Sequence, residues 1–295
     1  PAWAIRDGVV YLRGAVTETV TGTSLFSQLP VGARPSRNLY IEVYTASDST
    51  GDLFIVSDGS LEAYNGEATT FTSLATVSFP TAAVAAHRLT LQNGWQSSQS
   101  TYQTGNPSYA VSHGVVYLSG SLHGGKSELA FVLPKAARPA HLMNISVYTM
   151  DGSIGWLTIR STGQVRIGGG GSADYTSLAT VSFPVASTKW HAFKLIADWH
   201  SGASRFRTGA PSYAVVSGVV FLAGSMYQSS AGTIGLWTDV PAAAQPRHVL
   251  EIKAYMLNGA AGAVAMTTLG LVSSNPFSTA RAYTSLAGIS YPPSS

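Results

Sequence analysis

The chain has 295 residues, of which 45% are hydrophobic and 11% are charged, and its formal net charge is +3. Ample apolar residues and a charged fraction far below the usual value of about 25% exclude an intrinsically disordered chain. The 17 Lys and Arg residues form no basic run and cysteine is absent, so we expect no nucleic-acid partner, no disulfide framework and no thiolate metal site.

The first predicted strands lie in the stretch PAWAIRDGVVYLRG, at Pro1–Gly14. A turn bounded by prolines follows at Pro30–Pro35, then the stretches LYIEVYTA and GDLFIVSDGSLEAY, then FTSLATVSFP at Phe71–Pro80. These stretches are rich in Val, Ile, Tyr and Thr and are separated by Gly, Asp and Pro, which is typical of short antiparallel strands. No window carries a convincing helical stripe longer than two turns.

The same three blocks recur twice more in the same order. They return at Pro107–Gly120, Pro134–Pro139 and Tyr175–Pro184, and again at Pro211–Gly224, Pro241–Pro246 and Tyr283–Pro292. Such a pattern indicates tandem duplication. We therefore predict an all-β protein of three antiparallel, jelly-roll-like β-sandwiches, with residues 1–84, 85–188 and 189–295 as copies one, two and three.

A further segment occurs twice, at residues 87–106 (HRLTLQNGWQSSQSTYQTGN) and 191–210, and we call it the leading segment. It either opens copies two and three, so that copy one lacks it, or closes copies one and two. We favour the leading position, with predicted strands at Arg88–Gly94 and Ala192–Asp198. A proline at position 1, on a repeat boundary, suggests that residues upstream of it were removed.

The order of LTLQNGW, PSYAVSHGVVYLSGSL, VLPKAARPAHLMNISVYT and YTSLATVSFP resembles the C-terminal head modules of bacteriophage tail-fibre and baseplate receptor-binding proteins. It is also similar to modules of secreted or prophage-derived proteins of actinobacteria. The resemblance implies β-sandwich heads that usually form homotrimers and hold a host-surface saccharide near the protomer boundaries. Three copies in one chain then imply either a pseudo-trimer within the chain or beads on a string that gain avidity.

Residues for catalysis or metal binding show no supporting pattern. The seven histidines include no i, i+4 pair, and the acids Asp48, Asp52, Asp58, Glu62 and Glu67 cluster in copy one only. Glycoside hydrolysis needs two carboxylates at a set separation, and copies two and three keep no such pair. We expect no enzyme activity, no catalytic residue, no cofactor and no metal. The apolar stretches also fall short of the ~20 residues of a membrane helix, so no membrane insertion is expected.

Aromatic residues found in only one copy are the best candidates for ligand contacts. A saccharide offers apolar C–H faces that stack on aromatic rings and hydroxyl groups that bond to polar neighbours. We predict three such pairs in loops: Trp156 with Asp151, Tyr64 with Asn65, and Tyr227 with Gln228. Each ring is equally compatible with a solitary exposed aromatic residue.

These observations favour a non-enzymatic recognition module that binds a cell-surface saccharide. The expected location is extracellular, on a phage-like particle or as a secreted protein, with other particle proteins as further partners. The alternative is a structural or assembly subunit that acts through protein–protein contacts, because oligomer interfaces are also depleted in charge.

Overall fold

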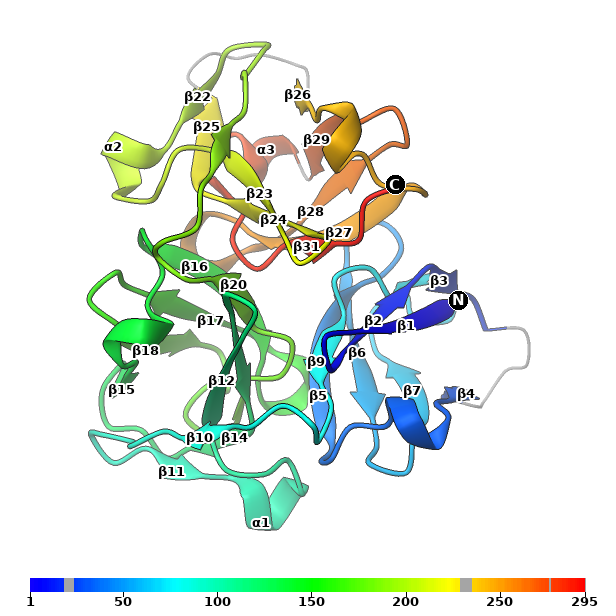
Figure 1. Ribbon diagram of the computed structural model, residues 1–295, viewed down its shortest axis with the longest axis vertical. Coiled ribbons are helices and arrows are strands. Elements are labelled where there is room, and N and C mark those ends of the chain that lie inside the picture. The colour runs from blue at the N-terminus through cyan, green and yellow to red at the C-terminus, as the bar shows by residue number, and fades with distance from the viewer. Residues whose placement is uncertain (19–23, 229–234, 276, 295) are drawn as a thin grey trace.

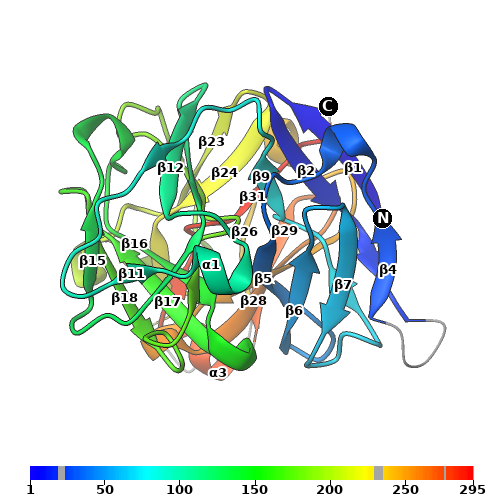
Figure 2. The same cartoon turned by 90° about the horizontal axis from the view of Figure 1, so that it is seen from below.

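The structure is a computed structural model that describes residues 1–18, 24–228, 235–275 and 277–294. Its sheets are antiparallel, and its helices are single turns of three or four residues. The predicted all-β sandwich fold is confirmed. Figure 1 shows three lobes in chain order around a common centre, and Figure 2 shows the lobes of copies one and two side by side from below. Among the described residues, no helix has the length or apolar run needed to cross a bilayer.

Copy one contains three sheets and the short helix η1 (Val31–Ala33). In sheet order, the strands are β1 (Ala2–Arg6), β2 (Val9–Arg13) and β9 (Ser78–Pro80); β3 (Ala15–Val16) and β8 (Thr72–Ser73); and β4 (Leu25–Gln28), β7 (Ser60–Tyr64), β6 (Thr50–Ile55) and β5 (Leu39–Tyr44). The stretch VVYLRGAV is divided between two of these sheets. Gly14 separates the two parts at a φ of +87°, a conformation that glycine adopts without steric cost.

Copy two repeats these sheets and adds one strand to each of the first two. Its strands are β10 (His87–Arg88), β12 (Ser108–Ser112), β13 (Val115–Ser119) and β20 (Ser182–Pro184); β11 (Gln96–Ser97), β14 (Ser121–His123) and β19 (Thr176–Ser177); and β15 (Leu129–Val132), β18 (Gln164–Gly169), β17 (Ile154–Ile159) and β16 (Met143–Tyr148). Its helices are α1 (Gln99–Tyr102), η2 (Lys135–Ala137) and η3 (Met150–Gly152).

Copy three has the same sheets as copy two. Its strands are β21 (His191–Ala192), β23 (Ser212–Val216), β24 (Val219–Ala223) and β31 (Ser290–Tyr291); β22 (Trp199–Ser201), β25 (Ser225–Gln228) and β30 (Thr284–Ser285); and β26 (Leu236–Asp239), β29 (Leu271–Asn275), β28 (Ala261–Met266) and β27 (Leu250–Tyr255). Its helices are α2 (Ala203–Phe206), η4 (Ala242–Ala244), η5 (Leu257–Gly259) and α3 (Phe277–Ala280).

The leading segment pairs with the copy that follows it, but not as the single strand Arg88–Gly94 that the sequence predicts. Strand pairing in β10 ends at Arg88, Leu91 forms an isolated bridge with Phe131 of β15, and the chain then pairs again in β11, which belongs to another sheet. Between them Leu89 enters the core of copy two, and Asn93 and Gly94 turn the chain at φ values of 51° and 80°. The segment in copy three is divided in the same way, between β21 and β22. The segment therefore crosses from one sheet to the other and covers the core between them.

Each copy has its own core, and the three cores are linked in a ring. Ala179 of copy two packs against the core of copy one, and Ala287 of copy three packs against the core of copy two. Ala75 of copy one packs against the core of copy three. These three alanines occupy the same place in the third repeat block, so the contact between neighbouring copies is the same one used three times.

Equivalent strands β5, β16 and β27 contact one another where the copies meet. At the same position in these strands stand Glu42, Ser146 and Lys253. The Lys253 ammonium lies 2.9 Å from Glu42 Oε2 and donates to the Ser146 carbonyl oxygen at 3.0 Å. We call this contact the central ion pair. Three copies of one residue there would place like groups together, whereas the diverged residues are complementary in charge.

A second set of equivalent residues meets on β2, β13 and β24. Tyr11 and Tyr117 are buried, with hydroxyl oxygens 3.2 Å apart, and Phe221 takes the third position without a hydroxyl group. Burial raises the pKa of both phenols, most strongly that of Tyr117. The substitution of phenylalanine in copy three leaves two hydroxyl groups, which can satisfy each other with one hydrogen bond.

Candidate functional site

Six aromatic rings gather at the boundary between copies one and two, and we call them the aromatic cluster. They are Tyr40 of β5, Phe54 of β6, Tyr64 of β7, Tyr102 of α1, Tyr148 of β16, and Tyr175, which precedes β19. Tyr40 lies at the middle, with ring centroids 4.7 Å from Phe54, 5.9 Å from Tyr102 and 5.6 Å from Tyr175. Most of these contacts are edge-to-face, the arrangement that the ring quadrupole favours.

The six rings of the cluster differ in how far they are buried. Tyr148 and Tyr175 are buried, whereas Tyr40, Phe54, Tyr64 and Tyr102 are half-buried. In β5, β6 and β7 the cluster residues occupy the outer face of the sheet, because side chains alternate between the two faces of a strand. The sheet therefore presents three aromatic residues outward, and α1 of the next copy supplies the fourth.

Polar groups border the exposed rings. The Tyr64 hydroxyl donates to Glu62 Oε2 at 2.5 Å, and this bond raises the pKa of Tyr64. Burial also raises the pKa of Tyr40. Glu62 itself is half-buried. Aromatic rings can contact the C–H groups of a polyol that has apolar faces, and a neighbouring carboxylate can accept hydrogen bonds from its hydroxyl groups.

Asp52 lies beneath this surface and is only 2% exposed. Asn65 Nδ2 donates to Asp52 Oδ2 at 2.5 Å, and burial raises the pKa of Asp52 to about 6, with the nearby Glu42 charge adding to the effect. A carboxyl group enclosed to this degree contributes to packing and cannot reach a substrate from this position.

The predicted pair Tyr64 and Asn65 lies at the edge of the aromatic cluster. Tyr64 contacts Phe54 at a centroid distance of 5.1 Å and remains half-buried. Tyr64 is the last residue of strand β7, and not a loop residue as the sequence predicts, and Asn65 is exposed directly after it. Asn65 has a φ of +60° that asparagine tolerates, but its amide is committed to Asp52. Of the two, Tyr64 is therefore the one free to contact a ligand.

The predicted residue Trp156 lies in strand β17 and not in a loop, which corrects the location expected from the sequence. Its half-buried ring fills the space beside Gly168, where an added Cβ would lie 2.4 Å from the indole, and faces Gly259 of copy three. The ring therefore packs at the boundary between copies two and three. The side chain of its predicted partner Asp151 lies outside the described residues.

The predicted residues Tyr227 and Gln228 end strand β25, so this pair also lies in a strand and not in a loop. The half-buried Tyr227 ring is covered by the Arg205 guanidinium, whose carbon lies 4.7 Å from the ring centroid. Gln228 is buried, and its amide donates to the Ala197 carbonyl oxygen at 2.6 Å. Gln228 therefore stabilises the sheet, and Tyr227 already has a cation on its face.

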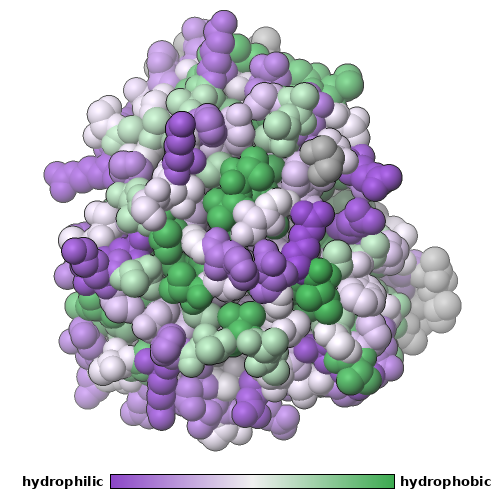
Figure 3. All heavy atoms as spheres, in the orientation of Figure 1, coloured by the Kyte–Doolittle hydropathy of each residue, from purple (hydrophilic) through white to green (hydrophobic). Residues whose placement is uncertain are grey.

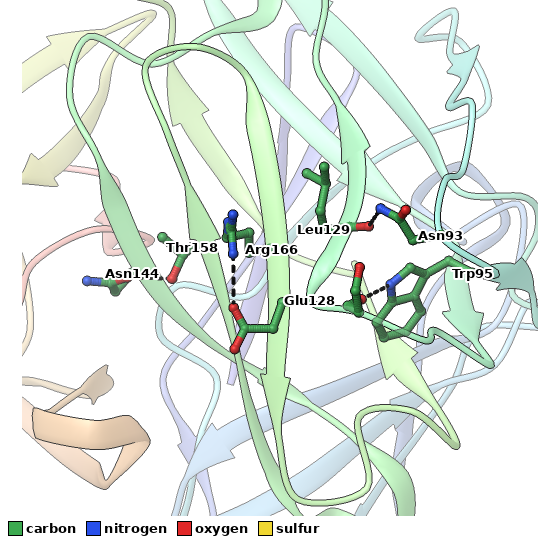
Figure 4. Close-up of polar contacts among 8 residues, drawn as sticks. Asn93, Trp95, Glu128, Leu129, Asn144, Thr158 and Arg166 are labelled. Carbon is green, nitrogen blue, oxygen red and sulfur yellow. Dashed lines mark hydrogen bonds and ion pairs between the residues drawn. The ribbon is translucent and has the colours of Figure 1, made fainter.

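The other two boundaries differ from the aromatic cluster at the equivalent positions. Tyr40 and Phe54 correspond to Asn144 and Thr158 at the boundary between copies two and three, where the Thr158 hydroxyl donates to Asn144 Oδ1 at 2.8 Å (Figure 4). In copy three the same positions hold Glu251 and Ala265. Tyr40, Phe54 and Tyr64 are thus particular to one boundary. The other three rings, Tyr102, Tyr148 and Tyr175, have aromatic equivalents in Phe206, Tyr255 and Tyr283.

Tyr40, Phe54 and Tyr102 are not among the site residues predicted from the sequence. For Tyr40 and Phe54 the usable signal was an outward strand position where the other copies carry polar or small residues, as Asn144 and Glu251 do at the position of Tyr40. A search limited to loops passes over such positions. Tyr102 lies in α1 and has the aromatic equivalent Phe206, so that signal does not find it.

Within the described part of the chain, no three His, Cys, Asp or Glu side chains gather as metal ligands would. Comparisons of the chain with protein-family models, with curated proteins and with solved structures give no match.

Proposed function

We propose that the protein is a non-enzymatic recognition module that binds a cell-surface saccharide at the aromatic cluster. The observation that carries this proposal is the group of four half-exposed rings beside the Glu62 carboxylate. Rings of this kind supply large contact areas at low conformational cost, and Tyr hydroxyl groups add hydrogen bonds. A saccharide needs both kinds of contact.

The arrangement of the copies supports a second part of the proposal, that one chain replaces a homotrimer. Equivalent alanines link the three cores in a ring, and Glu42, Ser146 and Lys253 meet at the centre. A homotrimer has three identical boundaries, whereas a single chain allows each boundary to diverge. The proposed function uses this freedom, because only the boundary between copies one and two carries Tyr40, Phe54 and Tyr64.

A glycan array tests the proposal. The parent chain should bind a defined set of glycans, and Tyr64→Ala should lose that binding while its melting temperature stays close to that of the parent. Tyr227→Ala is the matched control, since Tyr227 is also a half-buried strand tyrosine but lies in copy three. No binding to any glycan, or equal loss in both variants, would contradict the proposal.

A further inference from the structure

The outer edge of β1 has no partner strand among the described residues. β1 pairs only with β2, whereas the equivalent strands β12 and β23 each pair on both sides. All five residues of β1 are exposed, and Trp3 is 46% exposed. Ala4 is exposed although the equivalent Ala110 and Ala214 are 2% and 1% exposed. An unpaired edge of this kind is a template for another strand.

Copies two and three show what covers this edge. In copy two, β10 pairs with β12, and the Leu89 N–H donates to the Pro107 carbonyl oxygen at 2.8 Å. Figure 4 shows the next contacts: Asn93 Nδ2 donates to the Leu129 carbonyl oxygen, and Trp95 Nε1 donates to that of Ser127, both at 2.8 Å. Copy three repeats the first bond from Phe193 to Pro211 at 2.9 Å.

Copy one has a cavity of about 480 Å³ beside the second unpaired edge, that of β3. Val16 and Phe26 line this cavity, and their equivalents in copy two, Leu122 and Ala130, share a core cluster with Trp95. Pro1 also lines it and is exposed, although Pro107 is buried. The cavity is therefore the place that a tryptophan of a leading segment takes in copy two.

A second cavity, of about 500 Å³, lies between copies three and one and is lined by Phe71 and Val249 among others. The equivalent cavity between copies two and three is about 170 Å³, and Gly209 and Ala210 of the leading segment help to line it. Phe71 is half-buried, whereas the equivalent Tyr175 and Tyr283 are buried.

The leading segments explain this difference in burial. Tyr102 and Phe206, at the same place in the two leading segments, pack edge-on against Tyr175 and Tyr283, with centroid distances of 4.4 and 4.6 Å. Phe71 offers the same surface in copy one. The two cavities and the β1 edge thus correspond to three parts of one segment.

We propose that copy one is an acceptor for an extended polypeptide segment with the pattern of the leading segment: two apolar residues in alternation, tryptophan four residues after the second, and a further aromatic residue seven positions later. The segments at 87–106 and 191–210 share this pattern and are already paired within copies two and three. A second copy of residues 1–295 therefore has no free segment to donate, and the occupant is a polypeptide segment of this chemistry from outside residues 1–295.

Fluorescence anisotropy with a labelled peptide of residues 87–107 tests the proposal on the full chain. We expect saturable binding, at least tenfold weaker for a peptide carrying Leu89→Ser, Leu91→Ser and Trp95→Ser. Binding should persist in the Tyr64→Ala chain, because the aromatic cluster lies at another boundary. No saturable binding, or equal binding of the substituted peptide, would overturn the proposal.

Disulfide trapping tests the register, which the absence of cysteine from the chain makes simple. Arg88 pairs with Ser108, the equivalent of Ala2. A peptide with Arg88→Cys should therefore cross-link to chain Ala2→Cys, since Cα atoms of opposed residues lie within disulfide range. It should not cross-link to Arg6→Cys, at the far end of β1. Equal cross-linking of both variants, or Ala2→Cys chains that link to each other as dimers, would show a different occupant.

Discussion

The central ion pair joins the first and third copies at the point where all three meet. Glu42 is buried together with its carboxylate, and its Oε1 atom has no hydrogen-bond partner. Burying two charges costs solvation energy that their mutual attraction offsets only when their geometry is good. We therefore expect the pair to specify which copies face each other and to contribute little net stability.

Substituting one member of the central ion pair should therefore affect stability differently from substituting both. Lys253→Met leaves Glu42 buried without its cation and should lower the free energy of unfolding by about 3 to 5 kcal/mol. Combining Lys253→Met with Glu42→Leu removes both charges and should restore stability to within about 1 kcal/mol of the parent. Urea denaturation measures both values, and a double variant as unstable as the single one would contradict this account.

Asp52 should make the free energy of unfolding depend on pH in a defined direction. Because its pKa is raised in the folded state to about 6, the folded chain favours the protonated form. The stability that Asp52 contributes is present below about pH 4 and is lost as pH rises through 6.

Asp52→Asn should therefore be more stable than the parent at pH 7.5. A shift of two units corresponds to about 2.7 kcal/mol, which solvent screening reduces to about 1 to 2 kcal/mol. The difference should vanish near pH 4, because the asparagine amide oxygen can still accept from Asn65. Denaturation curves at both pH values test this, and an Asp52→Asn chain less stable at pH 7.5 would exclude the assigned cause.

Strand β18 has a glycine where strand β17 has a large aromatic side chain. The Trp156 ring lies over Gly168, where any larger residue would overlap it. Gly168→Leu should therefore displace the ring and cost about 1 to 3 kcal/mol, the usual cost of overpacking. Gly32→Ala is the control, because nothing lies within 4 Å of its added Cβ. Thermal melts of the two variants that shifted equally would contradict this role of Gly168.

The strands were predictable where their pattern is local. The hairpin of β6 and β7 follows from alternation and from the turn between them, and the repeat blocks supplied the same evidence three times. The break in the leading segment after Arg88 was not predictable, because Leu89 is drawn into a core that forms only after the sheets assemble. Trp156 was placed in a loop for the same reason, since its partner Gly168 belongs to another strand.

In the aromatic cluster, too, local features were predictable from the sequence and contacts between copies were not. Alternation could place Tyr40 on an outward strand position, and comparison of the copies could show that the position is variable. Its contact with Tyr102 could not be predicted, because it depends on which copy lies beside which. Tyr64 was predictable because copy one alone carries an aromatic residue at this position, where the other copies have Gly168 and Asn275.

The three copies act as one assembly in which equivalent positions have taken different roles. Equivalent residues form the ring of alanines, the central ion pair and the three boundaries. Only the boundary between copies one and two adds Tyr40, Phe54 and Tyr64 to its aromatic residues. A homotrimer would repeat every site three times. The single chain should therefore have one saccharide site where a homotrimer would have three.

Titration calorimetry with a glycan selected on the array measures this number directly. We predict one glycan bound per chain, with affinity weakened about 5- to 150-fold by Tyr64→Ala, which corresponds to the roughly 1 to 3 kcal/mol typical of stacking on an aromatic side chain. Tyr227→Ala should leave both the affinity and the stoichiometry unchanged. Three equal sites per chain, or one site whose affinity does not change in Tyr64→Ala, would contradict the account.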